Sequence, residues 1–334
     1  MTRSDAGYVR PRDIDNRSTL RQRLQWRLET LAWDLVYWAP MKALGPERAS
    51  GLAGRLMRWL GPRLSQHQTT LRNLRLAFPD WDEAKVRATA LDAWENVGRT
   101  AGELPHLHRI DPYTSGRVEV VGAERLDRIE ADRSGAVFIS GHLANWEVMA
   151  AAICRRPVDC LVTYRALNNP HIDRRLNAVR RAYGVGVLAP KGLGTRELMR
   201  ALSAGRSVAL MNDQKFNQGL SVPFFGHPAM TAPGPTRLAL KYGVPVVPVS
   251  TVRTGPARFR VTIHPPLDAP RTGDADADTQ AMVGAINAFL EARIRENPAQ
   301  WFWQHRRWPK SAWRDAGALA PKDVQPATTS DQTS

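Results

Sequence analysis

The sequence predicts an α/β fold, a mainly parallel central sheet flanked by helices, with an N-terminal helical extension that associates with a membrane. Two observations predict the sheet. Short segments rich in β-branched residues recur between residues 118 and 263, and helical segments separate most of them. This alternation is typical of parallel strands joined by crossover helices. The third observation predicts the extension: arginine, tryptophan and leucine concentrate between residues 20 and 64.

Length and composition limit the kind of protein. A chain of 334 residues holds one large α/β domain with extensions, or two small domains. Its 43% hydrophobic and 24% charged residues are ordinary for a globular protein, but its net charge of +15 is not. Such a charge predicts a negative partner, which is nucleic acid, an anionic membrane surface or an acidic carrier protein.

Cysteine content and apolar runs indicate the compartment. Cys154 and Cys160 are too few for a disulfide framework, and a reducing, cytosolic setting is expected. The first twenty residues lack the apolar centre of a secretory signal. Residues 31–44 are the nearest approach to the roughly 20 apolar residues of a membrane span, but two charges and a proline interrupt them. We therefore expect no integral membrane protein.

The chain divides into four parts. We expect a loose N-terminus at 1–18, basic amphipathic membrane-associating helices at 19–66, the main domain at 67–314 and a disordered tail at 315–334. Tryptophan beside arginine favours helices that lie in a membrane interface. The alternative is a basic helical pair packed on the main domain.

The main domain begins with helices and continues with alternating strands and helices. Two helices are expected over 69–104 around a stop at Pro79, with Asp80 or Asp82 as the N-cap of the second. Strands are expected at 118–121, 136–140, 161–164, 185–188, 207–211, 244–252 and 258–263, the last alternating like an edge strand. Helices are expected at 123–129, 145–153, 172–183, 195–202, 236–242 and 279–296.

Residues 136–150, AVFISGHLANWEVMA, carry the main candidate site. A buried strand ends at Gly141, His142 follows, and an apolar helix begins near Asn145. Open α/β sheets keep their ligand sites at the carboxyl ends of strands. Residues five apart on one helix point about 140° away from each other. Glu147 can therefore orient the His142 imidazole only if His142 lies on the turn and Glu147 in the helix's first turn.

The same spacing occurs at His106 and Asp111, without a preceding strand or a following apolar helix. We predict that this second copy is a solvated loop. A histidine held by a carboxylate is suited to remove a proton from a hydroxyl. The sequence contains no G-x-S-x-G, H-E-x-x-H or C-x-x-C pattern. Direct attack by a substrate hydroxyl, without a metal, is therefore the simpler mechanism.

Further candidates lie at other strand ends. Asn212-Asp213-Gln214 ends the strand at 207–211, and we expect it on the same rim as His142. The apolar loop at 222–226 is suited to line a slot for a hydrocarbon chain, or is a turn packed by its aromatic rings. Arg165 follows the strand at 161–164, and Arg180 and Arg181 precede Tyr183-Gly184. An arginine at a strand end is suited to bind phosphate or to stabilise an oxyanion.

Residues 301–309, WFWQHRRWP, interleave aromatic and basic side chains. Such a segment binds nucleic acid, coats a membrane interface or closes the domain. No nucleic-acid recognition module accompanies it, so we expect no nucleic-acid partner.

Several of these pieces together resemble the family of bacterial lipid A biosynthesis (lauroyl/myristoyl) acyltransferases, whose superfamily includes phosphatidylinositol mannoside acyltransferases. The matching pieces are NLRLAFP at 73–79, NVGR at 96–99, SGHLANWE at 140–147, DQ at 213–214, VPFFG at 222–226 and FWQHRRW at 302–308. The resemblance implies an O-acyltransferase with His142 and Glu147 as the catalytic pair. Arg180, Arg165, Asp213, Gln214 and Asn145 are its candidate substrate-binding residues.

The resemblance also implies partners. The acyl donor is expected to be a thioester of acyl carrier protein or coenzyme A, and no cofactor or metal is expected. The acceptor is a lipid A precursor, or another glycolipid such as a phosphatidylinositol mannoside, or an aminolipid. Anionic membrane lipids would hold the protein, peripheral or monotopic, on the cytoplasmic face of the inner membrane. A non-catalytic membrane-binding protein is the alternative from another class.

Overall fold

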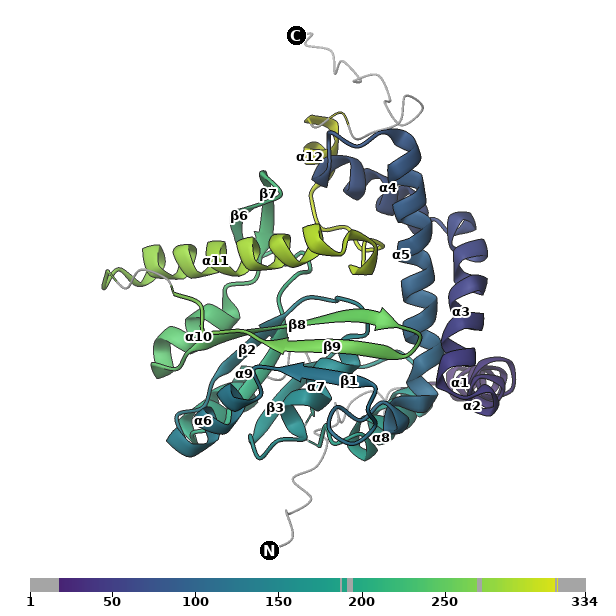
Figure 1. Ribbon diagram of the computed structural model, residues 1–334, viewed down its shortest axis with the longest axis horizontal. Helices are drawn as coiled ribbons and strands as arrows, with labels where there is room; N and C mark the ends of the chain where they lie inside the picture. Colours follow the sequence, from purple (N-terminus) through teal and green to yellow (C-terminus); the bar gives the residue numbers. More distant parts are fainter. Residues whose placement is uncertain (1–17, 187, 191–194, 269–271, 316, 318–334) are drawn as a thin grey trace, which may run out of the picture.

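The computed structural model describes residues 18–186, 188–190, 195–268, 272–315 and 317. A seven-stranded sheet forms the centre, helices cover both its faces, and the long helix α5 crosses one end (Figure 1). The predicted α/β fold with a mainly parallel sheet is therefore confirmed. Of the predicted loose N-terminus at 1–18 and disordered tail at 315–334, residues 1–17, 316 and 318–334 lie outside the described residues.

The sheet has the strand order β1-β9-β8-β2-β5-β3-β4. Strands β8, β2, β5, β3 and β4 are parallel, while β9 pairs antiparallel with β8 and parallel with β1. The strands are β1 (Val118–Val121), β2 (Val137–Ser140), β3 (Cys160–Tyr164), β4 (Leu188–Pro190), β5 (Ser207–Met211), β8 (Val246–Gly255) and β9 (Arg258–Ile263). β2 lies near the middle and is buried along its whole length, as its apolar sequence predicts.

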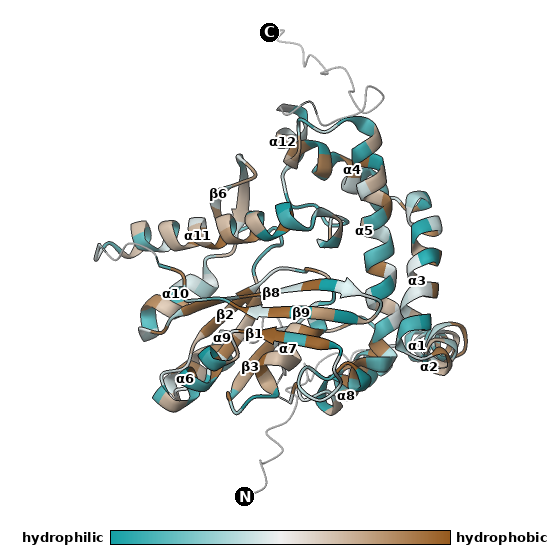
Figure 2. Cartoon of the chain, viewed as in Figure 1, coloured by the Kyte–Doolittle hydropathy of each residue, from teal (hydrophilic) through white to brown (hydrophobic). Residues whose placement is uncertain are grey.

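Helices cover the sheet in two layers. One face packs against α6 (Glu124–Asp132), α7 (Trp146–Cys154) and α8 (Pro170–Ala182). The other packs against α9 (Thr195–Ser203), α10 (Gly234–Tyr242) and α11 (Ala275–Glu296). Alternate side chains of β2 enter the two cores, Val137 and Ile139 on one side and Phe138 on the other. Figure 2 shows this apolar centre as brown strands between helices of mixed colour.

Residues 20–60 are helical except at Gly45. α1 (Leu20–Trp33) continues through the π-helical turn η1 (Asp34–Trp38) into α2 (Ala39–Leu44), and α3 (Pro46–Leu60) follows. Proline has no N–H to donate and clashes with the carbonyl four residues back, so Pro40 accounts for the wider π turn before it. Within the described residues, no helix is long and apolar enough to cross a membrane.

α3 packs along α5 (Glu83–Glu103), and glycine makes the close approach possible. A Cβ atom at Gly98 would lie 2.2 Å from the Ala53 carbonyl oxygen, and one at Gly102 would lie 2.4 Å from that of Ala49. Only glycine therefore allows this contact. The N-cap of α5 is Asp82, one of the two predicted N-caps, and its carboxylate accepts from the Lys85 backbone N–H. α4 (Gln66–Ala77) precedes it.

Three expectations about individual elements are wrong. β9 is not an edge strand, because β1 pairs with its outer side. Residues 222–226 are not a loop but part of a hairpin of β6 (Leu220–Phe224) and β7 (His227–Thr231). The fourth strand lies at Leu188–Pro190 and not at 185–188. Short segments lack the periodicity that would show their partners, and pairing depends on residues distant in sequence.

The His106–Asp111 segment is not a solvated loop. His106 lies in the 3₁₀ helix η3 (Leu104–Arg109), is 1% exposed, and its Nε2 lies 2.8 Å from the Met41 carbonyl oxygen. Asp111 accepts from the Tyr113 and Thr114 backbone N–H groups. The segment is buried because α2 covers it, and that contact joins residues 65 positions apart.

The C-terminal aromatic segment closes the domain. Trp301, Trp303, Trp308 and Arg307 are fully buried. The indole N–H of Trp308 donates to the Phe224 carbonyl at 3.1 Å, which seats the segment on the β6–β7 hairpin. The chain then forms α12 (Lys310–Asp315), at the point where the sequence predicts the start of a tail. Closing the domain is therefore the interpretation of 301–309 that the structure supports.

Candidate active site

His142 lies on the turn between β2 and α7, and Glu147 lies in the first turn of α7. This is the arrangement that the spacing required. Asn145 is the N-cap of α7, and its side-chain oxygen accepts from the Glu147 backbone N–H at 3.2 Å. The turn projects from the carboxyl end of β2, where α5 passes the sheet (Figure 1).

Asp213, not Glu147, binds the His142 imidazole. The Asp213 Oδ1 lies 2.8 Å from His142 Nδ1, and Oδ2 accepts from the His142 backbone N–H at 2.7 Å. A carboxylate only accepts hydrogen bonds, so Nδ1 must be the donor. The lone pair is then on Nε2, the nitrogen that a general base uses. One carboxylate thus holds both the ring and the backbone of the candidate base.

Asp213 remains charged although it is fully buried. Burial by itself raises the pKa of its carboxyl, but the His142 ring and backbone N–H lower that pKa far below its usual range. The Trp301 indole N–H adds a third hydrogen bond, 2.8 Å to Oδ2. A charged, oriented carboxylate behind a histidine stabilises the imidazolium that forms when the histidine takes a proton.

Glu147 instead forms an ion pair with Arg180. Its two oxygens accept from Arg180 Nε at 2.9 Å and Nη2 at 2.6 Å. Burial raises the pKa of Glu147, but Arg180 lowers it further, and the carboxylate stays charged. The expected orienting contact of Glu147 with the imidazole is not among the described hydrogen bonds, because α8 brings a bidentate guanidinium partner to the Glu147 side chain. The His142 ring still acts on Glu147 electrostatically and adds to the lowering of its pKa. If Arg180 also binds a phosphate or an oxyanion, as predicted, it must do so while its guanidinium is hydrogen-bonded to Glu147.

The His142 turn has a strained backbone that α5 holds in place. Ala144 has φ of +46°, a left-handed conformation that alanine rarely adopts. Its carbonyl accepts from the Thr100 hydroxyl at 2.9 Å and the Asn96 amide at 3.3 Å, both on α5. Its N–H donates to the Gln300 carbonyl at 2.7 Å. Such strain persists only where surrounding contacts over-determine it.

Glu103 joins this turn to the N-terminal helices. Its fully buried carboxylate accepts from Asn145 Nδ2 at 2.8 Å and from the Ser50 hydroxyl of α3 at 2.7 Å. Arg253 of β8 supplies the compensating charge and also binds Asn96 and Thr100. A buried polar network of this kind is rigid when every member is satisfied.

The other candidate residues differ in their burial and in their contacts. Asn145 is fully buried and both ends of its amide are hydrogen-bonded, which makes it a capping residue in this structure. Gln214 is half-buried beside Asp213, whereas Arg165 is exposed after β3. Phe224 and Phe225 pack among Trp301, Trp303 and Trp308, as the packed-turn alternative for 222–226 predicts. Trp146 and Phe302, both half-buried, flank the imidazole at ring-centre distances of 5.1 and 6.2 Å.

Comparison with known proteins agrees with this geometry. The model of the bacterial lipid A biosynthesis acyltransferase family matches residues 22–310, most of the chain. The chain belongs to this family. It is 28% identical to the phosphatidylinositol mannoside acyltransferase of Mycobacterium tuberculosis over 70% of this chain and 72% of that protein. It is also 28% identical to the lipid A biosynthesis lauroyltransferase of Escherichia coli, over 71% of this chain and 76% of that protein.

This lipid A acyltransferase family member is therefore an acyl-transfer enzyme. Among the described residues, no cluster of histidine, cysteine, aspartate and glutamate is arranged to hold a metal ion. The chemistry that the described site offers is proton transfer at His142 Nε2, with Asp213 as the charged partner of the ring.

The residues that hold the His142 turn were not predicted from the sequence. Asp213 was expected on the same rim as His142 but not as its partner, and no role was predicted for Thr100, Glu103 or Arg253. The NVGR piece at 96–99 was one available signal, because Asn96 belongs to it. Nothing in the local pattern around Arg253 marks its contact with Glu103, 150 residues away.

Proposed function

We propose that this enzyme transfers a fatty acyl chain from an acyl thioester to a hydroxyl of a membrane glycolipid, with a lipid A precursor as acceptor. The observation that carries the mechanism is the His142–Asp213 pair on the turn after β2. It supplies a general base whose accepting nitrogen is set by a buried carboxylate.

The proposed reaction needs no group beyond the two substrates. His142 Nε2 removes the proton from the acceptor hydroxyl as its oxygen attacks the thioester carbonyl carbon. The tetrahedral intermediate then collapses, the C–S bond breaks, and an ester remains. The leaving thiolate takes the proton from the His142 imidazolium, which returns the ring to its neutral state. Asp213 stabilises the imidazolium between these two transfers.

The similar proteins support a glycolipid acceptor. The names of the mycobacterial and E. coli relatives specify phosphatidylinositol mannoside and lipid A, and the chain is 28% identical to each. A phosphatidylinositol mannoside is therefore the alternative acceptor. We propose acyl carrier protein as the donor's carrier, with coenzyme A as the alternative, because a net charge of +15 favours an acidic partner.

We propose that the N-terminal helices place the enzyme on an anionic membrane, on the cytoplasmic face of the inner membrane. Leucines recur every three or four residues along α1 and are 55–84% exposed: Leu20, Leu24, Leu28 and Leu31. On α3, Leu52, Leu56 and Trp59 are also exposed, and the Arg63 guanidinium lies 4.2 Å over the Trp59 ring. Exposed apolar stripes with arginine beside them are typical of interfacial helices. The opposite side of α1 holds buried Trp26, so both alternatives for 19–66 are compatible with this segment.

The test is acyl transfer by the purified enzyme in vesicles that contain a lipid A precursor or a phosphatidylinositol mannoside. Thiol release and the mass of the acylated lipid are both measured, with acyl carrier protein and coenzyme A thioesters compared. His142→Ala should abolish transfer while leaving the melting temperature and vesicle binding unchanged. Transfer by purified His142→Ala would overturn the mechanism. The lipid mass spectrum of a strain that lacks the enzyme, set against its parent, would identify the acceptor.

A further inference from the structure

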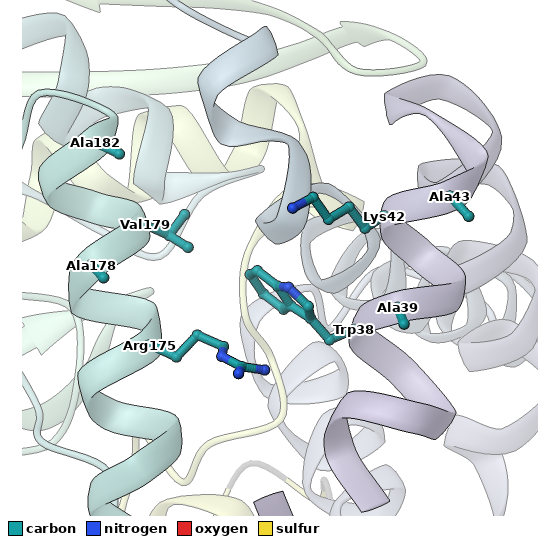
Figure 3. A pocket seen from close by; sticks show the side chains of 8 residues that line it. All are labelled: Trp38, Ala39, Lys42, Ala43, Arg175, Ala178, Val179 and Ala182. Atoms are coloured by element: carbon teal, nitrogen blue, oxygen red, sulfur yellow. The ribbon is translucent and has the colours of Figure 1, made fainter. Parts of the chain in front are cut away.

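A groove of about 750 Å³ lies between α2 and α8, outside the His142 turn. Figure 3 shows its two walls. The lining residues are Trp38, Ala39, Lys42 and Ala43 on one side and Arg175, Ala178, Val179 and Ala182 on the other. Arg180 of the same helix α8 instead binds Glu147. The groove is therefore a separate feature from the candidate active site.

The groove exists because the two helices are joined at one end and have short side chains beyond it. Asn169, the N-cap of α8, binds the Trp26 carbonyl and the Thr30 hydroxyl of α1. Asp34 of η1 then pairs with Arg175. Past this ion pair the walls consist mainly of alanine, whose methyl group is too short to fill the space between two helices. A mainly apolar surface remains open between the two helices.

Cationic groups stand at this apolar surface. In Figure 3 the side chains of Lys42 and Arg175 extend into the space between the helices, with the Trp38 ring between them. Lys42 is exposed and forms no ion pair with any described residue, whereas Arg175 shares its charge with Asp34. Burial, and then the charges of Arg109 and Lys42, lower the pKa of His108 on the neighbouring η3. Two cationic side chains thus stand at this apolar groove, on either side of the Trp38 ring.

We propose that this groove binds an anionic phospholipid, with the phosphodiester at Lys42 and an acyl chain along the alanine walls. A basic pocket between helices at a membrane surface is suited to an anionic head group. Tryptophan is enriched at the head-group level of membranes, which is where Trp38 would lie. The exposed leucines of α1 precede the groove along the same helix and would enter the bilayer beside it. The inference rests on the proposed membrane association and not on acyl transfer.

Vesicle flotation of the full-length enzyme tests the groove. Phosphatidylcholine vesicles are compared with vesicles in which phosphatidylglycerol replaces a fixed fraction of the lipid. Lys42→Gln should reduce the preference for anionic vesicles about fivefold, the factor expected for one charge at an anionic surface. Lys241→Gln, on α10, removes a charge outside the groove and should keep that preference.

Ala178→Trp is the sharper variant, because it fills the groove and leaves every charge in place. Ala178 is exposed, so the larger side chain does not disturb a core. It should reduce the anionic preference as much as Lys42→Gln does. Ala131→Trp places the same side chain on an exposed position of α6 and should have no effect. An Ala178→Trp enzyme that behaves like Ala131→Trp would overturn the proposal.

Flotation of the wild-type enzyme distinguishes the proposed lipid groove from the proposed membrane association. Equal binding to both kinds of vesicle would overturn the groove while leaving membrane association intact. Binding to neither would overturn membrane association and, with it, the groove. Acyl transfer is a separate measurement, and its loss or retention in these variants does not bear on lipid binding.

Discussion

Two regions of the molecule carry the same histidine-to-acid spacing, yet only one has the geometry of a general base. In both, the acidic residue pairs with an arginine: Glu147 with Arg180 at 2.6 Å and Asp111 with Arg155 at 2.6 Å. Among the described contacts, neither carboxylate hydrogen-bonds the histidine of its own pair. The shared spacing thus leads to the same kind of ion pair and does not itself make a site.

The two imidazole rings differ in their exposure and in their hydrogen-bond partners. His106 is 1% exposed, and its Nε2 is used by the Met41 carbonyl. The His142 side chain is 19% exposed, and its Nδ1 is held by Asp213. A base needs an accessible nitrogen and a partner for the charge that it acquires. Asp213 comes from the end of β5, so neighbouring parallel strands, rather than local spacing, assemble the pair.

The largest expected effect is on the acyl-transfer rate, which should differ between variants of the two histidines. His142→Ala should lower the acyl-transfer rate by at least about 1,000-fold, because the base is lost. His106→Ala should keep a near-normal rate and lose about 1–2 kcal/mol of stability, because it removes a buried hydrogen bond. Initial rates and melting curves of both variants check this. Similar losses of rate would show that the comparison is mistaken.

The next effect concerns the two carboxylates. Glu147→Gln leaves the Arg180 charge buried without its counterion, and should cost about 3–5 kcal/mol of stability. Glu147→Gln combined with Arg180→Gln should recover much of that stability and, with it, activity. Urea denaturation and initial rates measure both. A stable but inactive double variant would instead support the direct role of Glu147 or Arg180 in catalysis.

Asp213→Asn should lower kcat about 100-fold with little change in KM, because the neutral amide cannot stabilise the imidazolium. Asp111→Asn is the matched control, and its kcat should stay near the wild-type value. Steady-state kinetics at several pH values separate the two variants. Unchanged kcat in Asp213→Asn would remove Asp213 from the mechanism.

A third histidine, His305, is expected to make the stability of the fold depend on pH. Burial lowers the pKa of His305 from 6.5 to about 4. A folded-state pKa below the unfolded value contributes stability that is full above about pH 6.5 and lost as pH falls towards 4. Because His305 as a whole is only half-buried, we expect a loss of about 2 kcal/mol, less than the roughly 3 kcal/mol to which the full difference in pKa corresponds.

Urea denaturation between pH 7 and pH 4 measures this dependence, and His305→Phe should flatten it. The phenyl ring keeps the parallel stacking on Phe302, whose ring centre lies 6.0 Å away. A profile of equal steepness in the variant would assign the dependence to other groups. His264, whose pKa burial also lowers to about 4, is the first of these.

The smallest expected effect concerns the strained turn, a feature that the His106 region lacks. Thr100→Val keeps the side-chain volume but removes the hydroxyl that donates to the Ala144 carbonyl. It should lower kcat about tenfold, since misplacing a catalytic group has effects of this order or larger. Thr100→Ser should restore the rate.

Ser50→Ala is the control for stability. It removes a hydrogen bond from the same buried network, but on the side of α3, away from the turn. It should lower the melting temperature about as much as Thr100→Val and leave kcat unchanged. Equal kcat in Thr100→Val and Ser50→Ala would mean that the network stabilises the fold without positioning His142.

Much of the sheet was predictable from the sequence because a buried strand is a local property. The strands at 118–121, 207–211 and 258–263 have the predicted bounds, and β2 differs by one residue. The turn that carries His142 followed from a strand, a glycine and a helix start in succession. The domain division at 66–67 and 314–315 and the roles of Arg165, Gln214 and Asn145 in substrate binding stay predictions.

The sequence by itself therefore determined the α/β class, the place of His142 and the arginine-rich N-terminal helices. Only the tertiary structure decided which carboxylate serves His142, and why the turn tolerates a left-handed alanine. The physical reason is the separation along the sequence over which each interaction acts. Periodicity and turn chemistry act over a few residues, whereas Asp213 lies 71 residues from His142 and Thr100 lies 44 residues from Ala144. These partners meet only when parallel strands align their carboxyl ends and α5 packs across them.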